Sequence, residues 1–252
     1  MDILICIKRV PDIGAKIELS EDKRAISTRN LGFTISPHEE CAVEEAIQLI
    51  EKHGGSSTVL TLGPAAAEEQ VRDSMARGVE RALLLETDGG EWDPAETAAA
   101  IVETVRSRGE QPFDLLLFGN ESADSADFQV GIRVAHELDI PCISGVKDLE
   151  VRDGSVVGKR EVDDGWEVYE APLPAAVTVK EGINLPRYPS LRGTMKAKKK
   201  PVERRSVQRP GPGLLMEGLR HPPEVGKEVE MLGQGPSAAP KVVEVLKSLE
   251  VI

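Results

Sequence analysis

The residue types that perform acid–base, nucleophilic or metal chemistry are scattered in this chain. Its histidines and cysteines form no H-E-x-x-H, C-x-x-C or Ser/His/Asp arrangement. That excludes a zinc site built from neighbouring residues and leaves no evident nucleophile or acid–base pair. We therefore predict no catalytic residue and no metal ligand, and a chain that binds something rather than transforming it alone. The scattered residues are His38, His53, His136, His221, Cys6, Cys41 and Cys142.

Carboxylates and one thiol offer further candidates, and each has a structural explanation. Asp124 and Asp127 flank the start of a predicted helix, so they either cap it or contact a ligand. Glu44 and Glu45 are expected on the solvated face of another helix. Cys6 lies within an apolar run, which predicts a buried and unreactive thiol.

Short apolar runs alternate with helical patterns through the first two-thirds of the chain. The run at 3–7 has no polar break, which is typical of a strand buried on both faces. After Pro141 the pattern changes, and Asp153-Gly154 between alternating segments predicts a hairpin. A small hairpin is expected within 8–37. Predicted strands cover 3–7, 58–62, 81–86, 113–118, 147–152, 155–162, 166–169 and 175–179; predicted helices run from Ser36 to Gly54 and over 65–77, 95–106 (stopped by Gly109) and 128–138.

These elements predict an α/β fold: a doubly wound, mostly parallel, Rossmann-like sheet with an antiparallel extension and an extended C-terminal arm. In such sheets ligands bind beyond the carboxyl ends of the strands. The loops at 6–10, 62–64 and 119–131 occupy that edge and could hold a phosphate, or they are ordinary turns. No G-x-G-x-x-G follows the first strand, and no Walker A motif occurs.

The last quarter of the chain differs in composition from the rest. We divide the chain into an α/β domain at 1–183 and a segment at 184–252 that is expected to be ordered by a partner chain. Residues 192–205, the basic strip, hold seven basic residues and one acidic residue. The strip is either merely solvated or a docking surface for an acidic partner. Leu191 precedes it without periodicity to bury it, which favours an anchor beside a steering charge.

Net charge limits the classes of partner. The chain has 43 acidic and 31 basic residues, a formal charge of −12. That argues against nucleic acid and anionic membranes. No apolar run approaches the ~20 residues of a membrane span, and no signal peptide is evident. We expect a cytoplasmic protein with no direct membrane insertion.

Several separated blocks of sequence resemble the β subunit of electron transfer flavoproteins. Residues 184–191 (NLPRYPSL), followed by 195–200 (MKAKKK), are similar to that family's recognition loop. Residues 8–12 (KRVPD), 42–46 (AVEEA), 62–64 (LGP) and 119–131 agree in order and spacing, and 160–178 resembles the family signature.

The resemblance implies a heterodimer with an α subunit that holds a redox FAD. Electrons would come from acyl-CoA or related dehydrogenases and pass towards a membrane quinone oxidoreductase, and this chain would be an electron-carrier subunit rather than an enzyme. Segment 1–183 would be the nucleotide-binding domain and 184–252 would pack on the α subunit. Tyr188, Leu191, Met195, Lys196, Lys199 and Glu161 would contact partners. A structural AMP would contact Cys6, Ser36, Pro37, His38, Glu39, Leu62, Asp124, Ser125, Ala126, Asp127, Phe128, Gln129, Val130, Gly131, Ile132, Arg133, Val134 and Ala135.

Two alternatives stay open. Bifurcating relatives carry a second FAD where others carry AMP, and this chain could be of that kind. A stand-alone adenine-nucleotide-binding protein or nucleotide α-hydrolase would share the topology. The latter should show a Ser/Gly-rich loop after the first strand, where this chain has Lys8-Arg9-Val10.

Overall fold

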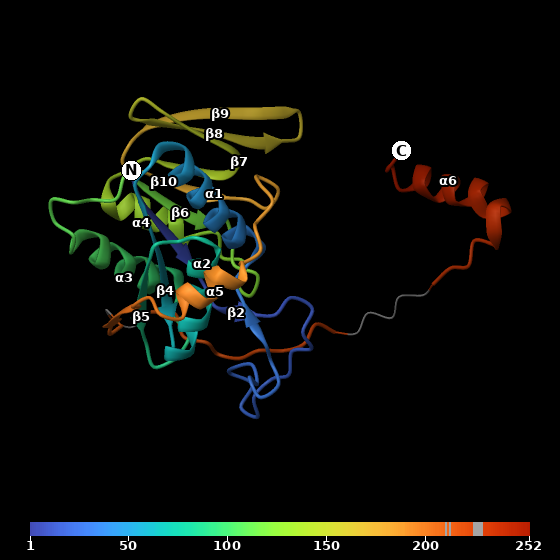
Figure 1. Ribbon diagram of the computed structural model, residues 1–252. Coiled ribbons are helices and arrows are strands. Elements are labelled where there is room, and N and C mark those ends of the chain that lie inside the picture. The colour runs from blue at the N-terminus through green and yellow to red at the C-terminus, as the bar shows by residue number, and fades with distance from the viewer. Residues whose placement is uncertain (210, 212, 224–228) are drawn as a thin grey trace.

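The computed structural model describes residues 1–209, 211, 213–223 and 229–252. Those residues build a nine-stranded sheet with the order β11-β5-β4-β1-β6-β10-β7-β8-β9, and a small two-stranded sheet, β2-β3 (Figure 1). The strands are β1 (Asp2–Ile7), β2 (Val10–Pro11), β3 (Phe33–Thr34), β4 (Ser56–Gly63), β5 (Arg81–Glu86), β6 (Leu115–Gly119), β7 (Cys142–Arg152), β8 (Ser155–Val162), β9 (Gly165–Pro172), β10 (Ala175–Val179) and β11 (Glu203–Ser206).

The central strands are parallel and buried on both faces, as the sequence predicts. In β1, Ile5 lies opposite Val59 of β4 on one side and Leu117 of β6 on the other. Successive β1 side chains point to opposite faces of the sheet. Thus Ile5 joins one core cluster and Leu4 the other. The α/β class with a doubly wound, mostly parallel sheet is confirmed.

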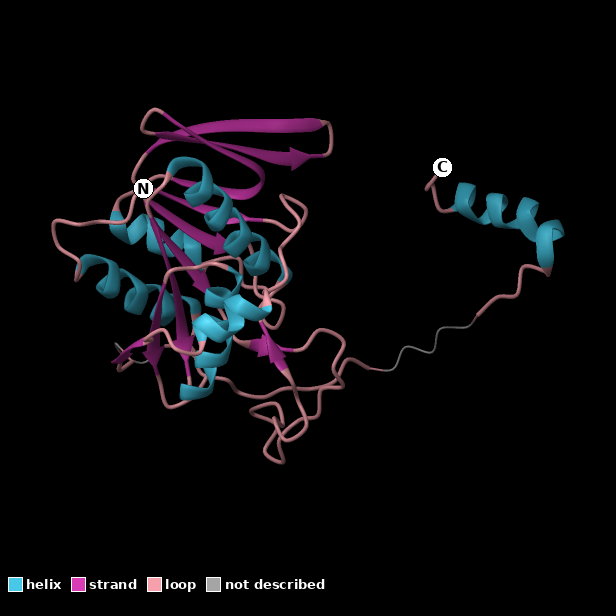
Figure 2. Cartoon of the chain, in the orientation of Figure 1, coloured by secondary structure: helices cyan, strands magenta, loops and turns pink. Residues whose placement is uncertain are grey.

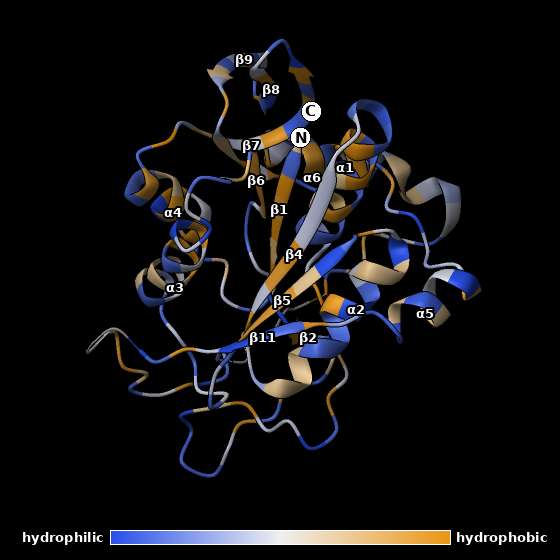
Figure 3. Ribbon diagram, turned by 60° about the vertical axis from the view of Figure 1, so that its left-hand side comes forward, coloured by the Kyte–Doolittle hydropathy of each residue, from blue (hydrophilic) through white to orange (hydrophobic). Residues whose placement is uncertain are grey.

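Helices cover both faces of this sheet (Figure 2). On one face, α1 (Pro37–His53) and α2 (Glu68–Arg77), the latter preceded by a 3-10 turn at Ala65–Ala67, pack against the cluster that contains Ile5. On the other face, α3 (Pro94–Arg106) and α4 (Val130–Leu138) pack against the cluster that contains Leu4. Figure 3 shows the apolar strands enclosed between these helices.

The antiparallel extension is present. Strands β7 and β8 are joined at Asp153-Gly154, where both residues have positive φ, 37° and 85°. Strand β9 follows β8 antiparallel and forms the edge of the sheet. The expected small hairpin in 8–37 corresponds to the pair β2 and β3.

Two elements of the C-terminal segment are not predicted by the sequence. A short helix, α5 (Leu191–Ala197), begins at the residue expected in a loop. Strand β11, within the basic strip, pairs in parallel with β5 and extends the sheet. Near the C-terminus lies α6 (Ala239–Ser248), preceded by a 3-10 turn at Gly235–Ala238.

Helix α3 ends at Arg106, as the sequence predicts, although its C-cap is Ser107 and not Gly109. Some predicted strand boundaries are wrong. Strand β6 begins at Leu115, since Phe113 lies before it and packs into the core instead. Among the described residues, no helix is both long and apolar enough to cross a membrane.

Candidate nucleotide site and recognition loop

The carboxyl ends of β1, β4, β6 and β10 lie at one edge of the sheet. Strand β1 is the point where the chain order reverses, because β4 and β5 follow on one side and β6 and β10 on the other. A crevice at such a switch point is the usual ligand site of a doubly wound sheet. The loops that follow β1 and β6 begin at this edge of the sheet.

A cavity of about 570 Å³ opens beside this crevice. Its apolar wall comes from the excursion between β2 and β3, and its polar groups come from the start of α1 and the loop after β6. Five of the predicted nucleotide contacts line it: Ser36, Pro37, His38, Asp124 and Ala126.

Ser36 and Glu39 hold the two polar walls together. The Glu39 carboxylate accepts backbone N–H groups from Ser36 (3.0 Å) and from Lys8 (2.8 Å), and so joins the end of β1 to the start of α1. The Ser36 hydroxyl accepts the backbone N–H of Ala123 (2.9 Å), which fixes the loop after β6. Burial raises the pKa of Glu39 to about 8, although these N–H donors favour its charged form.

An ion pair spans the mouth of the crevice. Lys8 Nζ lies 2.6 Å from Asp124 Oδ2, and the Asp124 side chain is 22% exposed. Burial acts to raise the pKa of Asp124, but the Lys8 ammonium and the hydrogen bonds from Ser122 and Ser125 together outweigh it, so the pKa is lowered. Asp124 does not cap α4, whose N-cap is Gln129 without a side-chain hydrogen bond, so the capping explanation is wrong.

Other predicted contacts lie farther from the cavity wall. Cys6 is buried at the end of β1, and burial raises its thiol pKa, which fits the expected unreactive thiol. Leu62 packs at the margin of the core. Ser125, Asp127, Phe128 and Gln129 are exposed in the loop before α4. Within α4, Gly131, Val134 and Ala135 are buried, while Val130 lies half-buried and Ile132 and Arg133 are exposed.

Four carboxylates converge on the cavity, and only one of them, Asp124, is among the contacts predicted from the sequence. Asp12 and Glu121 come from the loops after β2 and β6, and Glu181 follows β10. His38 Nδ1 is buried, has no hydrogen-bond partner among the described residues and lies 3.8 Å from Glu121 Oε1; burial lowers the pKa of this imidazole. Asp12 lies inside the KRVPD block, which is the one signal that could have located it.

The recognition loop, residues 184–191, places three large side chains in solvent: Leu185, Tyr188 and Leu191. Tyr188 is 94% exposed and Leu191 is 80% exposed. Leu191 is the first residue of α5, which packs on α2; Met195, Lys196 and Lys199 of this segment are also exposed. Glu161 lies instead on β8, a strand of the antiparallel extension (Figure 1). Its carboxylate pairs with Lys147.

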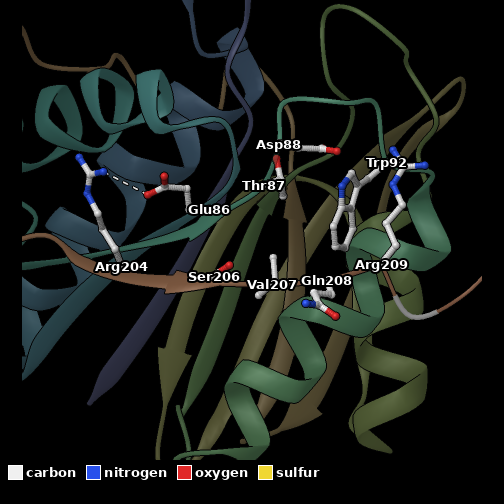
Figure 4. Close-up of a pocket in the computed structure, with 9 residues that line it drawn as sticks. All are labelled: Glu86, Thr87, Asp88, Trp92, Arg204, Ser206, Val207, Gln208 and Arg209. Atoms are coloured by element: carbon white, nitrogen blue, oxygen red, sulfur yellow. Dashed lines mark hydrogen bonds and ion pairs between the residues drawn. The ribbon is translucent and has the colours of Figure 1, made fainter.

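Some cations of the basic strip bind other residues of this chain, and others are exposed to solvent. Arg204 pairs with Glu68 and with Glu86 (3.1 Å), and Lys200 Nζ donates to the backbone oxygens of Val79 and Glu80. Figure 4 shows Arg204 and Glu86 beside a cavity of about 680 Å³ where β5 and β11 end. Four other exposed cations of the strip, Arg192, Lys196, Lys198 and Lys199, form no ion pair with the residues that the structure describes.

Comparison with known proteins identifies the family. The model of the electron transfer flavoprotein domain matches residues 24–210. The chain is 40% identical over 205 residues to the electron transfer flavoprotein subunit beta of Bacillus subtilis (strain 168), covering 81% of this chain and 78% of that one. The chain belongs to the electron transfer flavoprotein beta-subunit family. The namesake from Syntrophomonas wolfei is 37% identical over 203 residues, with 80% and 78% covered.

Membership in the electron transfer flavoprotein family implies an electron-carrier role beside an alpha subunit, with FAD in the pair. The matched residues 24–210 include the start of α1, the loop after β6, the recognition loop and the basic strip. Helix α6 lies outside that match.

Proposed function

We propose that this chain is the beta subunit of a heterodimeric electron transfer flavoprotein. It binds AMP as a structural ligand and docks dehydrogenases, so that electrons pass through the FAD of the alpha subunit towards a membrane quinone oxidoreductase. The proposal rests on two features that occur in the same chain. One is the cavity at the switch point of the sheet, and the other is exposed Leu191 beside the exposed cations of the basic strip.

The cavity fits the nucleoside end of AMP. Its volume of about 570 Å³ lies within the range of small-ligand pockets. Its carboxylates can accept hydrogen bonds from ribose hydroxyls and from the adenine amine, whereas they would repel a phosphate. The phosphate is therefore placed towards Lys8 at the mouth, where it would compete with Asp124 for the ammonium group.

The recognition loop supports the docking part of the proposal. An exposed leucine gives a small apolar anchor, and the four exposed cations beside it speed the encounter with an acidic partner. A small interface of this kind suits brief contacts with several dehydrogenases better than a large apolar patch would.

The division of chemistry follows from the same residues. FAD supplies the redox chemistry of the pair, so this chain needs no acid–base residues of its own. Its buried thiols are unreactive, and its three cysteines are free, which fits the cytoplasm that we propose as its location.

Co-purification with the electron transfer flavoprotein alpha chain of the same organism tests the proposal. The heterodimer is purified, its nucleotides are released with acid, and each is identified and counted. We expect one FAD and one AMP per heterodimer. Two FAD molecules and no AMP would instead establish the bifurcating kind, and a chain that never pairs would refute the proposal.

A further inference from the structure

One end of the recognition loop is clamped to α1. Arg187 forms a forked pair with Glu44: Nε lies 2.9 Å from Oε2 and Nη2 lies 3.0 Å from Oε1. The backbone N–H of Arg187 donates to the same carboxylate (3.1 Å), and Nη1 donates to Glu51 (2.7 Å). Asn184 Nδ2 donates to Glu45 (2.9 Å). Glu44 and Glu45 are buried, 4% and 7% exposed, so their expected solvated position is wrong.

The other end is clamped to α2. Arg72 Nη1 donates to the backbone oxygens of Ala197 (2.5 Å) and Lys200 (3.2 Å), just where α5 ends. Gly193 approaches α2 so closely that a Cβ there would lie 2.1 Å from the backbone oxygen of Ala76. Helix α5 therefore lies tightly against α2 and has no room to shift.

Only residues 188–190 separate Arg187 from α5, the helix that the second clamp holds. This tip contains Pro189, and Pro186 precedes Arg187, so its backbone has few alternative conformations. Ser190 fixes the start of α5, because its Oγ accepts the backbone N–H of Gly193 (3.0 Å). Exposed Tyr188 therefore lies in a segment of three residues with few alternative conformations, and exposed Leu191 follows it as the first residue of α5.

We propose that Arg187 and Arg72 are positioning residues that hold Tyr188 and Leu191 in the docking conformation before a partner arrives. This inference rests on the docking role proposed above. Ordering a loop on binding lowers affinity, so a loop already ordered in the free protein binds more tightly at the same contact area. The clamps would supply that order without touching the partner.

The variant Arg187→Lys tests the inference in the purified heterodimer. Lysine keeps the positive charge, so steering is unchanged, but it cannot reproduce the fork to Glu44 and Glu51. Arg72→Lys tests the other clamp. The matched control is Arg152→Lys, since Arg152 pairs with Glu150 on the exposed extension, away from the loop.

Two readouts are needed for each variant. Hydrogen exchange measures the order of backbone amides in 188–195, and steady-state kinetics with a purified acyl-CoA dehydrogenase measure KM and kcat for the heterodimer. We expect faster exchange in 188–195 and a rise in KM of roughly tenfold, ~1.4 kcal/mol, with kcat and salt dependence unchanged. The control should match the wild type in both.

Faster exchange with a wild-type KM would overturn the inference, and so would a raised KM with unchanged exchange. If Arg187→Lys does not fold, Glu51→Gln removes only the exposed half of the clamp and should shift both readouts less in the same direction. Leu191→Ala is measured in parallel. An unchanged KM for Leu191→Ala would refute the docking role itself, whereas a raised KM there with wild-type behaviour in Arg187→Lys refutes the clamp alone.

Discussion

Replacing Leu191 by alanine should weaken docking without disturbing the fold. Leu191 is 80% exposed, so almost all of its side chain is available to a partner and little of it supports this chain. The change removes three carbon atoms, each worth ~0.8 kcal/mol when buried, which with the exposed fraction gives about 2 kcal/mol. That loss corresponds to a roughly 25-fold weaker encounter.

Stopped-flow absorbance measures this effect directly. The heterodimer is mixed anaerobically with substrate-reduced acyl-CoA dehydrogenase at concentrations below saturation, and the second-order rate of flavin reduction is recorded. Val168→Ala is the matched control, because Val168 is a 61% exposed aliphatic residue on the extension. Thermal unfolding and nucleotide content should be unchanged in both variants. A Leu191→Ala rate within twofold of the wild type would refute the reasoning.

Three further predictions concern charge. Lys8→Met removes the ammonium group proposed to hold the phosphate, so the affinity of the heterodimer for AMP should fall at least tenfold in equilibrium dialysis. The control is Lys159→Met, which removes an exposed ion pair with Asp148. Raising the ionic strength from ~0.01 to ~0.15 M shortens the Debye length from about 30 to about 8 Å and screens the exposed cations of the strip. Flavin reduction by the dehydrogenase should therefore slow, and an unchanged rate would contradict electrostatic steering of the dehydrogenase. The pKa of Glu39 is about 8 in the folded protein against 4.5 in the unfolded chain, so the folded state favours the protonated carboxyl. The free energy of unfolding should therefore fall as the pH rises from about 5 to 8, by up to ~1.4 kcal/mol per pH unit. Urea titrations of Glu39→Gln should lose that slope relative to the wild type.

The sequence predicts the central sheet well because its signals are local. The apolar run at 81–86 predicts strand β5 over the residues that the structure shows, and Ser36 and Pro37 predict the start of α1. In each case a buried apolar run or a cap lies within a few residues of the element that it specifies.

The clamps and the edge strand depend on distant partners, which is why the sequence did not reveal them. The residues around Glu44 predict a solvated side chain, because its partner Arg187 lies 143 positions away in the sequence. Strand β11 is highly charged, and only pairing with β5 makes it a strand. The cavity wall between β2 and β3 is irregular backbone without periodicity, so no pattern marks it.

The most direct test of the account is electron transfer by the assembled pair. The purified heterodimer is mixed anaerobically with a catalytic amount of acyl-CoA dehydrogenase and its acyl-CoA substrate, and flavin absorbance is followed. We predict complete reduction of the alpha-subunit flavin, at a rate proportional to the dehydrogenase concentration, and far slower reduction of the alpha chain alone. Equal rates with and without this chain, or ATP turnover by this chain alone, would contradict the account.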